Sequence, residues 1–132
     1  MEKTKITIER TLRSRSKSII WKLISTPGGL SRWIAEEVRQ EGDALIFTWG
    51  KPGQEYETRR ADILKIVKNQ SLRFRWEDED DPSAYTEIAL VAPDVADELA
   101  LCITDYAEPD DEDSMTYMWN HDLDRLQYKM GV

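Results

Sequence analysis

Cysteine and histidine are almost missing from this chain of 132 residues, which has one of each, Cys102 and His121. A single cysteine excludes an intramolecular disulfide and favours a cytoplasmic protein. The pair also excludes a tetrahedral zinc site built from these residue types and a Cys–His nucleophile pair. We expect Cys102 to be a small packed residue and His121 to lie on the solvent side of its helix. We predict no metal and no cofactor.

Long apolar runs are missing as well. No segment approaches the roughly 18 consecutive apolar residues of a membrane span, and the start of the chain has no charged and then apolar signal. Hydrophobic residues make up 40% and charged residues 33% of the sequence. This composition and length predict a single globular domain over residues 1–132.

Charge is plentiful but unevenly placed. The 18 basic and 26 acidic residues give a net charge of −8, which argues against a nucleic-acid partner. Up to Arg75 the chain has 16 of the basic and 9 of the acidic residues, and the remainder has 2 and 17. Either late acidic segments lie beside early basic ones in the fold, or an acidic face binds a basic partner. We favour the first explanation.

Alternating polar and apolar residues predict a β-strand at Lys3–Leu12, with Ile6, Ile8, Arg10 and Leu12 on one face. Further strand signals follow at hairpin spacing, at residues 37–41, 44–49, 54–67, 72–76, 84–92 and 98–107. Glycine and proline predict a turn at 50–53. The adjacent apolar residues Ile63 and Leu64 indicate a bulge, which would bend the resulting antiparallel sheet.

Two short helices are predicted within Ser16–Val38, hinged at residues 26–29. Pro27 cannot continue the first helix but suits the opening turn of the second. A long helix is predicted from about Asp110, where carboxylates complement the helix dipole, to Gly131, which terminates it. Its apolar stripe at helical spacing comprises Met115, Trp119, Leu123, Leu126 and Met130.

Two charged residues lie on predicted apolar strand faces, where an unpaired charge would be costly. Arg10 shares its face with Ile8, and Asp105 shares its face with Leu101 and Ile103. Each could anchor a ligand in a cavity or form half of an internal ion pair. The alternative, which we favour, is that both lie near strand ends and reach water.

The order of these elements and four motifs resemble the START-like, helix-grip superfamily. Its members include polyketide cyclases, plant pathogenesis-related ligand binders and activators of the heat-shock ATPase. The motifs are IIWKLISTPGGLSRWI at Ile19–Ile34, FRWEDED at Phe74–Asp80, ITDYA at Ile103–Ala107 and the helix around Trp119–Leu126. The chain is most similar to a bacterial START-like family near the activator homologues.

The resemblance covers nearly the whole chain. It implies an α+β helix-grip fold, in which a curved antiparallel sheet of about six or seven strands surrounds a long C-terminal helix. Two short helices follow the first strand. The fold also implies a cavity between the concave face of the sheet and the long helix, with candidate ligand-binding residues Arg10, Trp33, Trp49, Phe74, Trp76, Leu101, Ile103, Asp105, Met115 and Trp119.

Five tryptophans in so short a chain fit an aromatic pocket, but they could equally fill the core. We predict non-enzymatic binding of a small, mostly apolar ligand. The alternative is a protein-interaction or co-chaperone-like domain that acts through its outer acidic surface. A weaker third hypothesis is a polyketide cyclase or hydrolase-like enzyme, although no catalytic constellation is visible. No family ligand motif can be matched to these residues.

Overall fold

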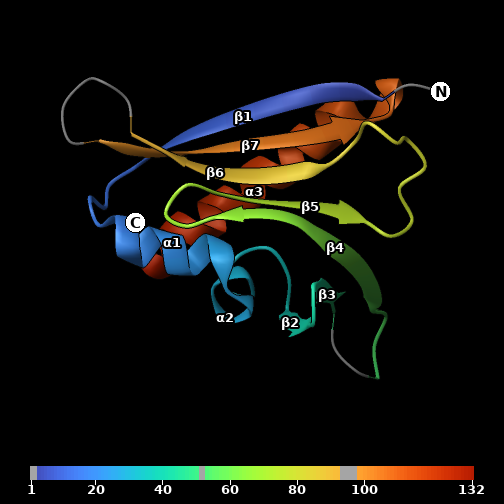
Figure 1. Ribbon diagram of the computed structural model, residues 1–132, viewed down its shortest axis with the longest axis horizontal. Helices are drawn as coiled ribbons and strands as arrows, with labels where there is room; N and C mark the ends of the chain where they lie inside the picture. The colour runs from blue at the N-terminus through green and yellow to red at the C-terminus, as the bar shows by residue number, and fades with distance from the viewer. Residues whose placement is uncertain (1–2, 51–52, 93–97) are drawn as a thin grey trace.

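The computed structural model describes residues 3–50, 53–92 and 98–132. Seven antiparallel strands form one sheet in the order β1-β7-β6-β5-β4-β3-β2. The strands are β1 (Thr4–Leu12), β2 (Glu37–Glu41), β3 (Ala44–Trp49), β4 (Glu57–Val67), β5 (Ser71–Trp76), β6 (Thr86–Val91) and β7 (Leu99–Ala107). The predicted helix-grip fold is confirmed, because this sheet holds a long C-terminal helix on its concave side (Figure 1).

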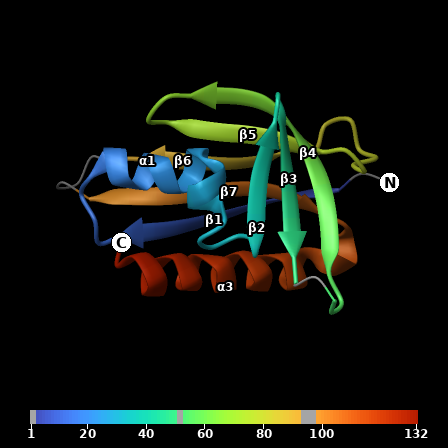
Figure 2. The ribbon, with the colours of Figure 1, turned by 90° about the horizontal axis from the view of Figure 1, so that it is seen from below.

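The sheet bends strongly along its length. Figure 2 shows β2 and β3 running across the direction of β1 and β7, while the long helix follows β1. The predicted bulge is present, because the pairing of β4 with β5 shifts between Ile63 and Lys65. Strand β4 begins at Glu57 rather than at the predicted residue 54, because Glu57 pairs with Trp49, the last residue of β3. Residues 51 and 52 of the predicted turn lie outside the described residues.

Helices α1 (Lys17–Ser25) and α2 (Pro27–Leu30) follow β1 and form a tight corner. Thr26 joins them, since its hydroxyl donates to the Lys22 carbonyl at 2.6 Å and accepts from the Gly29 N–H at 3.0 Å. A side chain at Gly29 would collide with the Lys22 carbonyl oxygen and would come within 2.6 Å of the Leu23 Cα. The predicted Pro-Gly-Gly hinge is therefore a closely packed joint.

Helix α3 (Glu112–Met130) follows a short 3-10 turn, η1 (Pro109–Asp111). Gly131 ends it in the left-handed conformation with φ of 67°, as predicted, and its N–H donates to the Gln127 carbonyl at 3.0 Å. None of the helices in the described residues is long and apolar enough to cross a membrane.

One core fills the space between the concave sheet face and the three helices. Its fully buried side chains come from every layer, and the largest are Trp33, Phe47, Phe74, Ile20, Ile24, Leu30, Leu72, Ile88, Leu101, Ile103, Leu123 and Leu126. Burial of these side chains supplies most of the driving force for folding. In α3 the apolar stripe is buried at Trp119, Leu123 and Leu126, whereas Met130 is 37% exposed.

The uneven charge of the sequence is partly neutralised within the fold. The acidic segment after β5 contacts basic residues from earlier in the chain: Arg59 bonds Asp78 at 2.8 Å, and Lys3 bonds Glu79 at 2.8 Å. Arg60 lies 3.3 Å from Glu77. Antiparallel neighbours therefore bring part of the basic half of the chain against the acidic half.

Candidate functional site

An aromatic cavity lies between the concave side of the sheet and the N-terminal half of α3. Its volume is about 460 Å³, which falls in the usual range of small-molecule sites. We use the name aromatic cavity for the space whose apolar walls are formed by Ile34, Trp49, Phe74, Trp76, Met115, Tyr117, Met118 and Trp119.

Part of its wall comes from alternate residues of β3 and β5, which lie on either side of β4. Phe47 and Trp49 on β3, and Phe74 and Trp76 on β5, are each two residues apart, so their side chains face the same concave side. Phe47 belongs to the core and contacts the three rings that line the cavity. The rings pack closely, with centroids 5.1 Å apart for Phe47 and Trp76 and 6.0 Å apart for Trp49 and Trp76. This contact holds the wall in a defined shape.

A buried carboxylate fixes the opposite wall. Asp105 on β7 accepts hydrogen bonds from the Trp119 indole at 2.8 Å, the Thr86 hydroxyl at 3.0 Å and the Tyr106 N–H at 2.9 Å. Burial raises the pKa of Asp105, and the hydrogen bonds from Trp119, Tyr106 and Thr86 oppose this rise. Asp105 thus holds Trp119 in place and has few remaining sites for a ligand.

A second buried carboxylate, Asp122, lines the cavity one helical turn after Trp119. Burial raises the pKa of Asp122 to about 7, although the Arg125 guanidinium 3.2 Å away opposes the rise. Asp122 is not among the predicted site residues. Its spacing of three residues from Trp119 is the signal that the sequence offers, because residues i and i+3 share a helix face.

The other charges around the aromatic cavity are paired. Lys3 bonds Glu79, and Arg59 bonds Asp78 while its guanidinium lies 4.0 Å from the Trp76 ring centroid. Among the residues that line the cavity, three cations (Lys3, Arg59, Arg125) face three carboxylates (Glu79, Asp105, Asp122). The cavity therefore offers an apolar interior whose neighbouring cations are matched in number by carboxyl groups.

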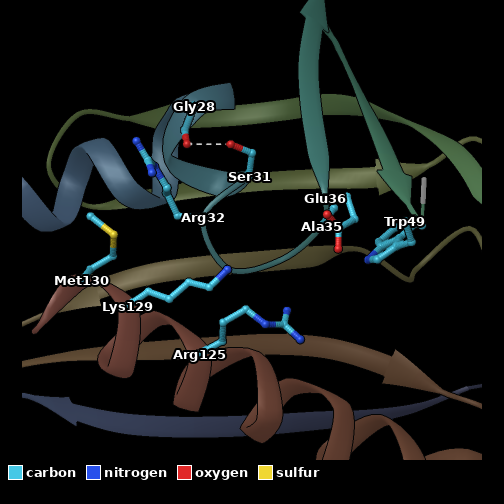
Figure 3. A pocket seen from close by; sticks show the side chains of 10 residues that line it. Gly28, Ser31, Arg32, Ala35, Glu36, Trp49, Arg125, Lys129 and Met130 are labelled. Carbon is cyan, nitrogen blue, oxygen red and sulfur yellow. Dashed lines mark hydrogen bonds between the residues drawn. The ribbon is translucent and has the colours of Figure 1, made fainter. Parts of the chain in front are cut away.

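A second hollow adjoins the aromatic cavity. This basic pocket, of about 810 Å³, lies between the α2–β2 segment and the C-terminal half of α3 (Figure 3). Its lining contains Arg32, Arg125 and Lys129 together with one carboxylate, Glu36. In Figure 3 Arg125 and Lys129 extend from α3, and Arg32 comes from the facing segment, where the Ser31 hydroxyl bonds the Gly28 carbonyl.

Two side chains, Trp49 and Arg125, line both hollows, and we call this shared boundary the partition. The Trp49 indole donates to the Ile34 carbonyl at 2.8 Å, and Arg125 Nη1 donates to the Trp33 carbonyl at 2.8 Å. The Trp33 indole in turn donates to the Leu23 carbonyl at 3.0 Å. The segment after α2 therefore positions the partition between the hollows.

The predicted site residues fall into three groups. Trp33, Leu101 and Ile103 are fully buried in the core and do not line the aromatic cavity. Arg10 lies elsewhere, bonded to Asp124 at 2.8 Å and to Gln127 at 2.9 Å on α3. The remaining six line the aromatic cavity, and they are Trp49, Phe74, Trp76, Asp105, Met115 and Trp119.

The lone histidine and cysteine show no catalytic arrangement in the described part of the chain. His121 is exposed and stacks on Tyr117 with ring centroids 6.1 Å apart, yet it lies at the mouth of the aromatic cavity. Cys102 lies on the outer face of β7, where burial and the nearby carboxylates of Glu9 and Glu87 raise the pKa of its thiol. A raised thiol pKa disfavours the nucleophilic thiolate.

Comparison with known proteins identifies relatives of this fold. A family model described as a START-like superfamily domain matches residues 1–132. A solution structure of BfR322 from Bacteroides fragilis is 34% identical and has a TM-score of 0.64, with 98% of this chain and 93% of that chain covered. The comparison with curated proteins finds no match.

Two further structures share the fold at lower identity. The Aha1 dimer from Colwellia psychrerythraea is 17% identical with a TM-score of 0.63, over 91% of this chain and 90% of that chain. DynU16, from the dynemicin biosynthetic locus, is 11% identical with a TM-score of 0.74, over 97% of this chain and 47% of that chain. Since the family model spans the whole sequence, the chain belongs to the START-like superfamily.

Proposed function

We propose that this protein binds a small, mostly apolar molecule in the aromatic cavity. The START-like fold is consistent with a ligand-binding or interaction domain. The observation that carries the proposal is a space of about 460 Å³ walled by aromatic and methionine side chains whose neighbouring charges are paired. Ligand pockets of this kind bury an apolar body and orient it with a few polar groups.

A neutral fluorescent probe, N-phenyl-1-naphthylamine, tests the proposal. We expect saturable binding to the wild type and loss of binding in Met115→Lys, because a charged side chain in the cavity wall cannot be desolvated cheaply. The matched control is Tyr128→Lys, also on α3, since Tyr128 is exposed and lines neither the aromatic cavity nor the adjoining hollow. The Tyr128→Lys variant should bind like the wild type.

Native mass spectrometry of gently purified protein supplies a second readout. A stoichiometric adduct that disappears in Met115→Lys supports the proposal. A ligand at about 100 times its dissociation constant should stabilise the fold by about 2.7 kcal/mol, which appears as a shift of the melting temperature. Absence of both probe binding and adduct would favour the interaction-domain alternative, which salt-sensitive capture of a basic protein partner would support.

Asp122 gives the enzyme hypothesis one specific observation. A carboxyl group with a pKa of about 7 at the wall of an apolar cavity can act as a proton donor or acceptor near neutral pH. The mass of a molecule captured from the cell tests this role. A new product mass formed by the wild type and not by Asp122→Asn supports catalysis, whereas an unchanged mass supports binding alone.

A further inference from the structure

The basic pocket stands out because of where its cations occur in the sequence. After Arg75 the chain contains two basic residues against 17 acidic ones, and those two are Arg125 and Lys129. They lie four residues apart on α3, so they are neighbours on one helix face. Both line the basic pocket, and Arg32 lines its facing wall. The most acidic part of the chain therefore places both of its cations in one hollow.

The salt bridges and side-chain hydrogen bonds of the described residues leave part of the bonding capacity of these cations free. Within residues 3–50, 53–92 and 98–132, neither Arg32 nor Lys129 forms a salt bridge. The side-chain hydrogen bonds of Arg125 in the same ranges both come from Nη1. Its Nε and Nη2 remain for another acceptor, and a guanidinium edge of this kind matches the two oxygens of a carboxylate.

The basic pocket differs in this respect from the aromatic cavity beside it. The cations of the aromatic cavity are matched in number by carboxylates, whereas the lining of the basic pocket has three cations and Glu36. Trp49 and Arg125 belong to both linings, so a molecule that passes this partition would touch both environments. One end of such a molecule would meet aromatic rings, and the other end would meet unpaired cations.

We propose that the basic pocket binds the oxyanion, of the carboxylate type, of an amphipathic ligand whose apolar body occupies the aromatic cavity. This inference rests on the proposed function and specifies its ligand class as singly charged amphipathic anions. Arg125 contacts the anion from the partition, and Lys129 and Arg32 contribute the surrounding positive charge. Glu36 sets a limit on the charge that the pocket accepts, because a like charge lies in the same lining.

Isothermal titration calorimetry with a matched pair of probes tests the proposal. Decanoate and decan-1-ol share an alkyl body and differ in the anionic group, and acetate represents the anionic group alone. We expect decanoate to bind the wild type about tenfold more tightly than decan-1-ol, since charge-assisted hydrogen bonds exceed neutral ones. Raising the salt concentration to about 0.5 M should weaken decanoate binding and leave decan-1-ol binding unchanged.

The double variant Arg32→Gln/Lys129→Gln removes two exposed cations without touching the core. We expect its preference for decanoate to fall to about twofold or less, with binding of decan-1-ol unchanged. The control is Lys65→Gln/Lys68→Gln, which makes the same change in net charge at exposed residues outside both linings. The control should retain the full preference of the wild type.

The outcomes separate this inference from the proposed function. Equal affinities for both probes in the wild type, or a full preference in Arg32→Gln/Lys129→Gln, would overturn the anion site and leave apolar binding standing. Failure of decan-1-ol and decanoate alike would overturn both proposals. Acetate that binds as tightly as decanoate would show that the alkyl body contributes nothing, which would overturn the amphipathic ligand.

Discussion

The indole nitrogen of Trp119 donates a hydrogen bond of 2.8 Å to a carboxylate oxygen of Asp105. This bond attaches the long helix to β7, and it does so inside the space where a ligand would lie. Both side chains are almost completely buried, so neither group can exchange its partner for water without cost. The pair therefore sets the position of one cavity wall.

A double-mutant cycle on this pair should show strong coupling. We expect Trp119→Phe and Asp105→Asn each to lower the free energy of unfolding by about 1–3 kcal/mol, because each disturbs a buried hydrogen bond. The double variant should lose less than the sum, with a coupling energy of about 1 kcal/mol or more. Urea unfolding measures all four proteins, and strictly additive losses would contradict the role assigned to the bond.

The stability of the fold should depend on pH through Asp122. Its folded pKa of about 7 exceeds the ordinary value of 3.8, so the folded state binds more protons than the unfolded state between these values. The stability contributed by this group is therefore fully present below about pH 4 and is lost as the pH rises through about 7. Asp122→Asn has no such titration.

The measurement for Asp122 is the unfolding free energy of wild type and Asp122→Asn at about pH 5 and about pH 8. From about pH 5 to about pH 8, the unfolding free energy of Asp122→Asn should rise relative to that of the wild type by on the order of 2 kcal/mol, because one pKa unit corresponds to about 1.36 kcal/mol. Asp105 has a raised pKa in both proteins and cancels in the difference. Parallel pH profiles would show that Asp122 is not the titrating group.

Adjacent glycines at the corner of α1 and α2 should respond oppositely to alanine. Gly29→Ala places a methyl group against the Lys22 carbonyl and Leu23 Cα, so we expect a loss of about 2 kcal/mol or more. Gly28 has open space around the corresponding position. Gly28→Ala is the matched control and should be neutral or slightly stabilising, since alanine favours the helix. Equal melting temperatures for the two variants would refute this packing argument.

Arg10 should stabilise the helix without affecting the cavity. Its bonds to Asp124 and Gln127 connect β1 to the outer side of α3. Because Asp124 is largely exposed, we expect Arg10→Ala to cost only about 0.5–1 kcal/mol of stability, with binding of N-phenyl-1-naphthylamine unchanged. Loss of probe binding in a folded Arg10→Ala protein would instead support the predicted role of Arg10 as a ligand anchor.

The helices and strands of the fold could be predicted from the sequence. Strand β1 alternates strictly, Ile63 and Leu64 mark a bulge, and Gly131 ends α3, because each of these signals is local. The two hollows were harder to predict from the sequence. The basic pocket joins Arg32 to Lys129 across 97 positions of the sequence, because the segment between α2 and β2 contacts α3 in the folded chain.

Asp122 shows a different limit of sequence reasoning. The spacing of Asp122 from Trp119 can be read from the sequence. A carboxylate at the edge of an apolar helix face can also reach water, however, so this spacing does not predict burial. Burial of Asp122 depends on how closely α3 packs against the concave face of the sheet, and the curvature of the sheet results from all of its strands together. Arg10 and Asp105 began with equivalent patterns and ended in different environments for the same reason.

The partition between the two hollows has a consequence for how selectivity could change. Trp49 and Arg125 are held in place by hydrogen bonds to the main-chain carbonyl groups of residues 34 and 33. Every amino acid supplies this carbonyl group, whatever its side chain. A smaller residue at position 49 would enlarge the space where the two linings meet. Evolution or protein design could therefore lengthen the accepted molecule by a single replacement at Trp49, at the cost of the ring contacts of Trp49 with Phe47 and Trp76.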